Sequence, residues 1–322
     1  MVEILSVRTS QAEHDIDRVN TELETVELSR PVPVDHQDAF GRPARSWLFM
    51  PAAAGPLRGL VVGVYPGSVD SGAWTGPLNL TYGLRAQVLV GAGFAVLSPA
   101  IPIDHPDANG ADYYVRSVDA AVDAALQAHP KLPSDRIAVM GHSFGGHVAL
   151  AIATRSSRYR SYVSWAGMSE MFSQWGEFVP VTRSLAEDRH MMRNQQGWLE
   201  TGQGGLNGPP WRDIQGYIDS SPYLAADRIS APVMMITADR DFVPMSQAEL
   251  MFSARYRLGG KTRLVTYWGE DHALWSPANI RDLYAQIFDW LDDTLSAPEG
   301  IRPDAQDGLP RSSPSLQMRR RP

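Results

Sequence analysis

The sequence predicts an α/β protein with a mostly parallel central sheet and helices on both of its faces. Short apolar runs alternate with segments of helical periodicity along most of the chain. Several runs are continuous and rich in Val and Ile, as in strands buried on both faces of a parallel sheet. One run leads directly into a glycine-flanked serine, in VMGHSFGGHVAL, and then into a helix-like segment.

Seven apolar runs are predicted to be strands, at residues 47–50, 60–65, 94–98, 137–140, 162–165, 233–237 and 263–267. Helices are predicted near residues 80–92, 112–128, 146–155, 246–257 and 277–295. The last helix has the clearest signal, because Ser276 is a natural N-cap, Pro277 suits the first helical position, and apolar residues then recur at helical spacing. The alternation implies right-handed crossovers between parallel strands.

The chain divides into a central domain and two polar ends. Residues 1–34 are predicted to be a polar, acid-rich extension, in which a helix is one option although no apolar stripe marks a core face. Residues 35–295 form one large domain, and residues 296–322, which are proline-rich and end in an arginine triplet, are expected to be a disordered tail. Within the domain, residues 168–230 break the rhythm and are either a lid over a pocket or an excursion packed on the sheet edge.

Composition excludes several classes of function. A chain of 322 residues with 43% hydrophobic and 20% charged residues is typical of a globular protein, and its net charge of −7 argues against nucleic-acid or anionic-membrane partners. The absence of cysteine excludes disulfides, thiolate zinc sites and a cysteine nucleophile. Neither a secretory signal nor an apolar stretch of roughly 18 residues is visible. We therefore expect a soluble, cytoplasmic protein, and the sequence leaves its oligomeric state open.

Ser143 is the candidate nucleophile. It lies in the pattern G-x-S-x-G between a predicted strand and a predicted helix, where the glycines two residues before and after permit a tight bend. The serine then stands at a helix N-terminus, which favours negative charge, and the backbone N–H of Phe144 is placed to donate to an oxyanion. The alternative is a structural turn without chemistry.

A serine hydroxyl needs a base, and in this architecture the acid and the histidine follow the serine in that order, each after a later strand. His272, in LVTYWGEDHALWSP, is the one histidine of eight that follows a late strand and precedes the final helix. The acid is Asp241 or Asp239, at the end of VMMITADRDFVP. Glu270 and Asp271 are expected to be solvated loop charges.

The other histidines are expected to have no catalytic part. His142 and His147 flank the serine and are expected to be structural. The remaining five are expected in loops or in the polar N-terminal region, namely His14, His36, His105, His129 and His190. No pair of them has metal-ligand spacing, so we expect neither a metal nor a cofactor.

Over about residues 35–295 the chain resembles the catalytic domain of the prolyl oligopeptidase family of serine peptidases, within the α/β-hydrolase fold. The resemblance rests on GHSFGG, SPYLAADRISAPVMMITADRDFVP, GEDHALWSPANIRDLYAQIFDWL and the lead-in DAFGRPARSWLFMP. It implies that the acid is Asp241 rather than Asp239, because the family acid follows its strand in the pattern T/G-x-x-D. The spacing to Val243-Pro244 is one residue shorter than usual.

The resemblance also implies that the hydroxyl of Tyr65, in VVGVYPGS, lies in the oxyanion hole, although Pro66-Gly67-Ser68 replaces the family's common Gly-Gly-Pro. The alternative is a buried aromatic side chain at a strand end. Full family members carry a β-propeller before the catalytic domain, and only about 35 residues stand before it here. The chain is therefore expected to be either a truncated relative or a free-standing hydrolase with an open site.

We expect hydrolysis of a small peptide through an acyl-enzyme on Ser143, Asp241 and His272, with Phe144 and Tyr65 at the oxyanion. The acyl-side pocket is expected to be apolar and to suit a hydrophobic or proline-like group. Its candidate residues are Phe144, Trp165, Met171, Trp175 and Val243, each of which has a core position as its alternative. Two other functions stay open, a carboxylesterase with the same three residues and a non-catalytic binding module on the same fold.

Overall fold

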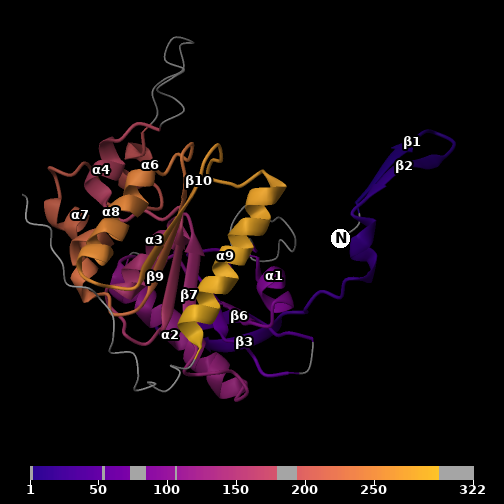
Figure 1. Cartoon of the computed structure of the whole chain (residues 1–322), viewed down its shortest axis with the longest axis horizontal. Helices are drawn as coiled ribbons and strands as arrows, with labels where there is room; N and C mark the ends of the chain where they lie inside the picture. The colour runs from indigo at the N-terminus through magenta and orange to yellow at the C-terminus, as the bar shows by residue number, and fades with distance from the viewer. Residues whose placement is uncertain (1–2, 53–54, 73–84, 106, 180–193, 297–322) are drawn as a thin grey trace, which may run out of the picture.

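An eight-stranded sheet forms the centre of the protein in the computed structural model, which describes residues 3–52, 55–72, 85–105, 107–179 and 194–296 (Figure 1). In spatial order the strands are β10 (Thr262–Tyr267), β9 (Val233–Ala238), β8 (Ser161–Trp165), β7 (Ile137–His142), β5 (Leu60–Gly63), β6 (Ala95–Ser98), β4 (Pro43–Phe49) and β3 (Val32–Gln37). The strands from β10 to β6 are parallel, and β4 is antiparallel to both of its neighbours, β6 and β3. The predicted fold class, an α/β-hydrolase sheet with helices on both faces, is confirmed.

Each face of the sheet has its own apolar core. On one face, Val62 and Val139 pack in a cluster with side chains of α2 (Ala111–Ala128), α3 (Phe144–Ala153) and α8 (Met245–Arg257). On the other face, Val61 and Ala138 pack with side chains of α1 (Ala86–Gly91) and α9 (Pro277–Leu295). Successive strand residues thus enter opposite cores, which explains why the strands read as continuous apolar runs. Within the described residues, no helix has the length and apolar character needed to cross a bilayer.

All seven predicted strands are present, and their ends differ from the predicted ranges by four residues or fewer. The helices predicted at 112–128, 146–155, 246–257 and 277–295 correspond to α2, α3, α8 and α9. The helix predicted near 80–92 corresponds to α1, and residues 80–84 of that prediction lie outside the described residues. Periodicity located these elements because the sheet is buried on both faces.

The region between β8 and β9 is helical. It contains α4 (Met171–Gly176), α6 (Gln196–Glu200), α7 (Ile214–Asp219) and the 3-10 helix η4 (Pro222–Arg228), and residues 180–193 lie outside the described residues. This is the region that the sequence marks as a lid or an excursion. Figure 1 shows α4, α6 and α7 gathered around α8, on one side of the sheet.

The N-terminal region forms a hairpin rather than the helix considered from its sequence. β1 (Glu3–Arg8) and β2 (Glu13–Val19) pair antiparallel, and a short 3-10 helix, η1 (Thr21–Thr25), follows. The Thr9 N–H donates to the Ala12 carbonyl over 2.7 Å, which closes the turn. Figure 1 shows this hairpin projecting away from the main sheet. Local turn bonds decide the structure here because no apolar stripe favours a helix.

The first strand of the main sheet, β3, is a further difference from the sequence prediction. The expected domain start at residue 35 falls inside β3, which pairs with β4 along its length. Its sequence, VPVDHQ, has only Val34 buried and contains a proline, so it lacks the apolar run that marks the inner strands. An edge strand tolerates this composition because one side of it faces no partner strand.

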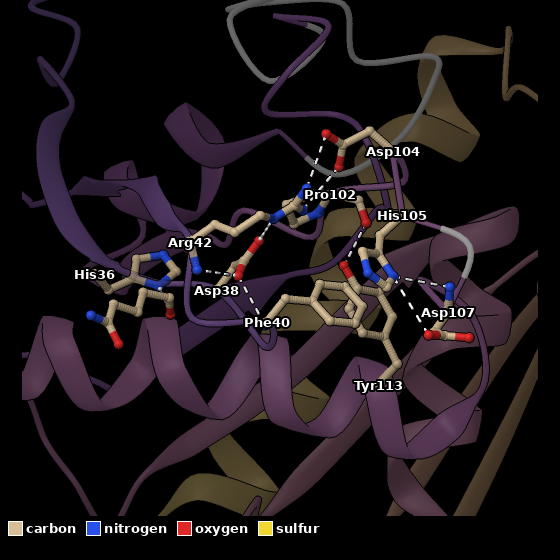
Figure 2. Close-up of polar contacts among 10 residues, drawn as sticks. His36, Asp38, Phe40, Arg42, Pro102, Asp104, His105, Asp107 and Tyr113 are labelled. Carbon is tan, nitrogen blue, oxygen red and sulfur yellow. Dashed lines mark hydrogen bonds and ion pairs between the residues drawn. The ribbon is translucent and has the colours of Figure 1, made fainter.

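The turn between β3 and β4 is organised by the buried carboxylate of Asp38. It accepts hydrogen bonds from the backbone N–H groups of Phe40 and Arg42, both 2.9 Å, and from the Arg42 side chain at 2.8 Å (Figure 2). The Arg42 guanidinium also reaches Asp104, and the Phe40 ring stacks on His105 at 3.8 Å between ring centres. The turn is thereby joined to the loop after β6.

We expect Asp38→Ala to lower the free energy of unfolding by about 1–3 kcal/mol at neutral pH, because it leaves three part-buried donors of the turn without their acceptor. Burial would raise the pKa of Asp38, but the hydrogen bonds from Arg42 and Phe40 outweigh it and hold the pKa below its ordinary value. The stabilisation is therefore fully present at a pH above the ordinary pKa of an aspartate. It is lost as the pH falls through the lowered pKa of Asp38. Urea unfolding of wild type and variant across this range measures it.

Asp104→Ala is the matched control, because it removes the other carboxylate on Arg42 from a side chain that is 71% exposed. We expect a smaller loss of stability from it than from Asp38→Ala. Equal losses in the two variants would contradict the anchoring role of Asp38.

Candidate active site

Ser143 stands at a strained bend between β7 and α3. Its backbone has φ 59° and ψ −124°, a region that non-glycine residues rarely adopt. The bend is fixed by its N–H, which donates to the Trp165 carbonyl at 2.8 Å, and by its carbonyl, which accepts from the His147 N–H at 3.1 Å. Ser143 is the one residue between 137 and 153 that is not buried. The bend therefore presents this side chain at the surface of an otherwise closed core.

The flanking glycines are required by close backbone contacts. A Cβ on Gly145 would lie 2.1 Å from the carbonyl oxygen of Val64, and one on Gly141 would lie 2.1 Å from the carbonyl oxygen of Gly145. Both distances are far inside van der Waals contact. The G-x-S-x-G pattern is thus explained by packing of the helix start against the strand β5 and its following loop.

Asp241 and His272 are joined by a hydrogen bond. They follow the C-terminal ends of their strands, as Ser143 does. Asp241 follows β9 and is 1% exposed, and His272 follows β10 and is 5% exposed. The His272 Nδ1 lies 2.9 and 3.1 Å from the two Asp241 carboxylate oxygens. A carboxylate can only accept, so Nδ1 carries a hydrogen, and in the neutral ring this leaves the lone pair on Nε2. This is the tautomer that a general base needs.

The two alternative acids have other partners. Asp239 accepts the Gly269 N–H, and Asp271 is exposed and accepts the Ala273 N–H. Glu270 was expected to be a solvated loop charge, and that expectation is wrong. It is 4% exposed, and it accepts from the backbone of Trp275 and Ser276 and from the Asn279 side chain, over 2.7 to 3.0 Å.

Glu270 anchors the start of α9. Burial would raise its pKa, but the hydrogen bonds from the Trp275 backbone and the Asn279 side chain outweigh burial and hold the pKa below the ordinary value. The side chain of Ser276, the predicted N-cap, makes no capping bond, and its N–H is bonded to Glu270 instead. Glu270 therefore fixes the loop that carries His272.

The two histidines beside the serine are buried and neutral. Burial lowers the pKa of His147 to about 4, and its Nδ1 lies 3.1 Å from the Met168 carbonyl. Burial also lowers the pKa of His142 to about 3. Of the more distant histidines, His105 stacks on Phe40, and His190 lies outside the described residues.

Tyr65 lies at the same edge of the sheet as Ser143. Gly63 on β5 is opposite Met140 on β7, so the residues that follow these strands emerge side by side. The Tyr65 ring meets the Phe144 ring edge to face at 6.4 Å, and the Tyr65 hydroxyl lies 3.4 Å from Gln203 Nε2. This hydroxyl is thus at the outer end of a half-buried side chain beside the bend.

The residues expected to form an acyl pocket are only partly brought together. Phe144 and Met171 line a cavity of about 100 Å³ along α3. Trp175 and Val243 are not among the residues that line this cavity; Trp175 donates its indole N–H to Glu200 at 2.7 Å, and Val243 is 3% exposed. Trp165 is 1% exposed and packs in the core against His142.

Two residues of the excursion reach the site and were not singled out from the sequence. The Trp198 ring lies edge to face on Phe144 at 5.6 Å, and its indole N–H donates to Gln203 at 3.3 Å. Gln203 also contacts Tyr65. The chain from α6 to residue 203 thus covers the helix start beside Ser143. Only the concentration of tryptophan and glycine in this region pointed toward it.

A strand–serine–helix bend, with an aspartate and a histidine joined beside the same edge of a parallel sheet, defines an α/β-hydrolase. A comparison with protein families gives a match to the model of the "Prolyl oligopeptidase family" over residues 109–297, which is more than half of the chain. The chain therefore belongs to the prolyl oligopeptidase family, a family of serine hydrolases.

Relatives extend the comparison to almost the whole chain. "Uncharacterized peptidase YuxL" of Bacillus subtilis (strain 168) is 24% identical over 310 residues, 91% of this chain and 44% of that protein. The structure "Acylaminoacyl peptidase in complex with Z-Gly-Gly-Phe-chloromethyl ketone" superposes with a TM-score of 0.68 at 15% identity, over 88% of this chain and 44% of that one. The human "Acyl-coenzyme A thioesterase 6" is 34% identical over 114 residues, 35% of this chain and 24% of that protein.

The chain thus spans less than half of the length of YuxL and of the acylaminoacyl peptidase. The likeness to the acylaminoacyl peptidase structure shows the shared fold.

The strain at residue 143 has a measurable consequence. We expect Ser143→Gly to be more stable than Ser143→Ala by about 1 kcal/mol, because glycine adopts this backbone conformation without the strain of a Cβ, even after its larger entropy in the unfolded chain. Both variants lack the hydroxyl, so denaturant unfolding of the pair isolates the backbone. A more stable alanine variant would contradict the strain.

Proposed function

We propose that this protein is a serine peptidase that cleaves amide bonds of small peptides through an acyl-enzyme. Ser143 Oγ attacks the carbonyl carbon, and His272 Nε2 takes its proton. Asp241 orients the imidazole and stabilises its cation. The Phe144 N–H and the Tyr65 hydroxyl bind the oxyanion. His272 then gives the proton to the leaving amine, and water releases the acyl group.

The Asp241–His272 hydrogen bond is the observation that carries this proposal. It fixes the tautomer in which Nε2 can accept a proton, and it pairs a buried carboxylate with the cation that forms during attack. The strained bend at Ser143 supports the same conclusion, because such backbone strain persists where the surrounding packing enforces it, and it concentrates at functional sites.

We assign the acyl side to the apolar surface beside Phe144. The Trp198 ring on Phe144 favours a hydrophobic or proline-like group. Met171 stays in the proposal as a flanking residue, because the cavity that it lines along α3 is not lined by Ser143, Asp241 or His272. Trp175 and Val243 stay in the proposal as flanking residues, and Trp165 is left as a core residue that supports the bend. A cytoplasmic location stays a prediction from the sequence.

Hydrolysis of oxygen or thiol esters is the second candidate. It would use the same three residues, and the local similarity to a human protein named as a thioesterase favours it. An amide is intrinsically harder to cleave than an ester of the same acid, so the two candidates differ in the rate on matched amides.

The first experiment uses a matched pair of substrates, a p-nitroanilide and a p-nitrophenyl ester of Z-Gly-Gly-Phe. We expect turnover of both by the wild type and a loss of several orders of magnitude in Ser143→Ala. Z-Gly-Gly-Phe-chloromethyl ketone should label the wild type, with mass spectrometry placing the alkylated residue at His272. Turnover of the ester alone would favour the second candidate. Undiminished turnover by Ser143→Ala would contradict both candidate functions.

The acid is tested separately. We expect Asp241→Asn to lower kcat by roughly 10⁴-fold, because an amide favours the wrong tautomer of the histidine, as in other Ser-His-Asp hydrolases. Asp239→Asn is the matched control, since this acid follows the same strand and bonds to Gly269 instead. We expect little change in its kcat. A large loss in the control with none in Asp241→Asn would reverse the assignment.

A further inference from the structure

His142, the residue directly before Ser143, contacts the loop that carries His272. It is the last residue of β7 and is 4% exposed. Its Nε2 lies 2.9 Å from the backbone carbonyl oxygen of His272. Its ring lies 4.6 Å from the His272 ring and 4.3 Å from the Trp165 ring, between centres. One buried side chain therefore joins the nucleophile bend to the histidine loop.

The direction of this hydrogen bond follows from its partner. A carbonyl oxygen only accepts, so the His142 Nε2 must carry the hydrogen. Burial, with a further contribution from His272, lowers the pKa of His142 to about 3, so the ring stays neutral at physiological pH. A neutral imidazole has one N–H, and this contact uses it. His142 is thus a donor of fixed direction rather than a proton carrier.

His272 is consequently held at two separate points. Asp241 holds its side chain at Nδ1, and His142 holds its backbone carbonyl. The outer face of its ring packs against Phe242, with 4.0 Å between ring centres. The Asp241 bond alone fixes Nδ1 but leaves the ring free to pivot about that point. A second bond, to the backbone, restricts the pivot and thereby the position of Nε2.

The other end of this connection is also held by backbone pairing. His142 is opposite Trp165 in the parallel ladder, and the Ser143 N–H donates to the Trp165 carbonyl. The side chain that contacts the His272 loop therefore starts from the backbone that sets the Ser143 conformation. Movement of either catalytic group relative to the other would strain the bond between His142 and His272.

We propose that His142 is a positioning residue, which holds the imidazole of His272 in register with the hydroxyl of Ser143 by donating its Nε2–H to the His272 carbonyl. This inference rests on the proposed function. The residue between the first glycine and the serine of G-x-S-x-G thus takes part in aligning the base, without touching the substrate.

The test compares His142→Gln with His142→Leu, using the p-nitroanilide above. Glutamine carries an amide N–H at about the position of the imidazole Nε2, and leucine carries no donor. A misplacement of about 1 Å costs on the order of 100-fold in rate. For the leucine variant we expect kcat to fall by on the order of 10- to 100-fold with little change in KM, and for glutamine we expect at least a tenfold recovery. Fluorophosphonate labelling of Ser143 should slow in the same proportion.

His147 provides the control, because it is a second buried neutral histidine that bonds to a backbone carbonyl, that of Met168. The matched donor variant here is His147→Asn, because the asparagine amide stands at about the position of the imidazole Nδ1. The ratio of kcat between His147→Asn and His147→Leu should be near one, whereas the ratio between His142→Gln and His142→Leu should be large. All rates are divided by the folded fraction from circular dichroism. Equal kcat in His142→Leu and wild type, or no recovery in His142→Gln, would overturn the proposal.

A measurement on the wild type covers the case in which His142→Leu fails to fold. With ¹⁵N-labelled histidine, the His142 ring should show its proton on Nε2 from pH 5 to 9, and a proton on Nδ1 would overturn the proposal. The outcomes also separate this inference from the proposed function. An inactive Ser143→Ala with a fully active His142→Leu would remove the positioning role alone, whereas an active Ser143→Ala would remove both.

Discussion

The close packing of the first turn of α3 against the carbonyl of Val64 is the constraint on which the site depends. With only 2.1 Å between that oxygen and a hypothetical Cβ on Gly145, the helix can begin here only if this residue has no side chain. The same packing holds Ser143 in a backbone conformation that it would not adopt alone. The position of the serine is therefore set by the meeting of β5, β7 and α3, and not by its own preferences.

A second consequence concerns the distribution of charge around the serine. The nearest ionisable groups are kept in single protonation states by burial and by their partners: His142 and His147 are neutral, and Glu270 is an anion bonded to three donors. His272 is bonded instead to a buried carboxylate, that of Asp241.

The sequence predicted most of the central fold because its strands are buried on both faces and leave uninterrupted apolar runs. β3 and the hairpin of β1 and β2 were missed since they lie at an edge or outside the sheet, where no core imposes a pattern. For the candidate site, the sequence predicted a serine, an acid and a histidine in this order because each follows a predicted strand. The sequence favoured Asp241 over Asp239 only through resemblance; in the structure Asp241 is bonded to His272 and Asp239 to Gly269.

Residues whose role depends on tertiary contacts could not be predicted from the sequence. In the sequence, Glu270 has the pattern of a loop charge beside Asp271. It is buried because donors at the start of α9 form hydrogen bonds to it. Trp198 and Gln203 meet Phe144 and Tyr65 only after the excursion has folded back over α3. No local periodicity encodes contacts of this kind.

The excursion itself leaves the sheet after β8 and returns to β9, its direct neighbour. Because both ends are fixed at adjacent strands, lengthening this connection costs little chain entropy, about 0.6 kcal/mol for each doubling. Descendants of this chain can therefore gain or lose whole helices in the excursion while the serine and its partners stay in place. The surface over the start of α3 can in this way change by insertion and deletion without displacing the strands that carry Ser143, Asp241 and His272.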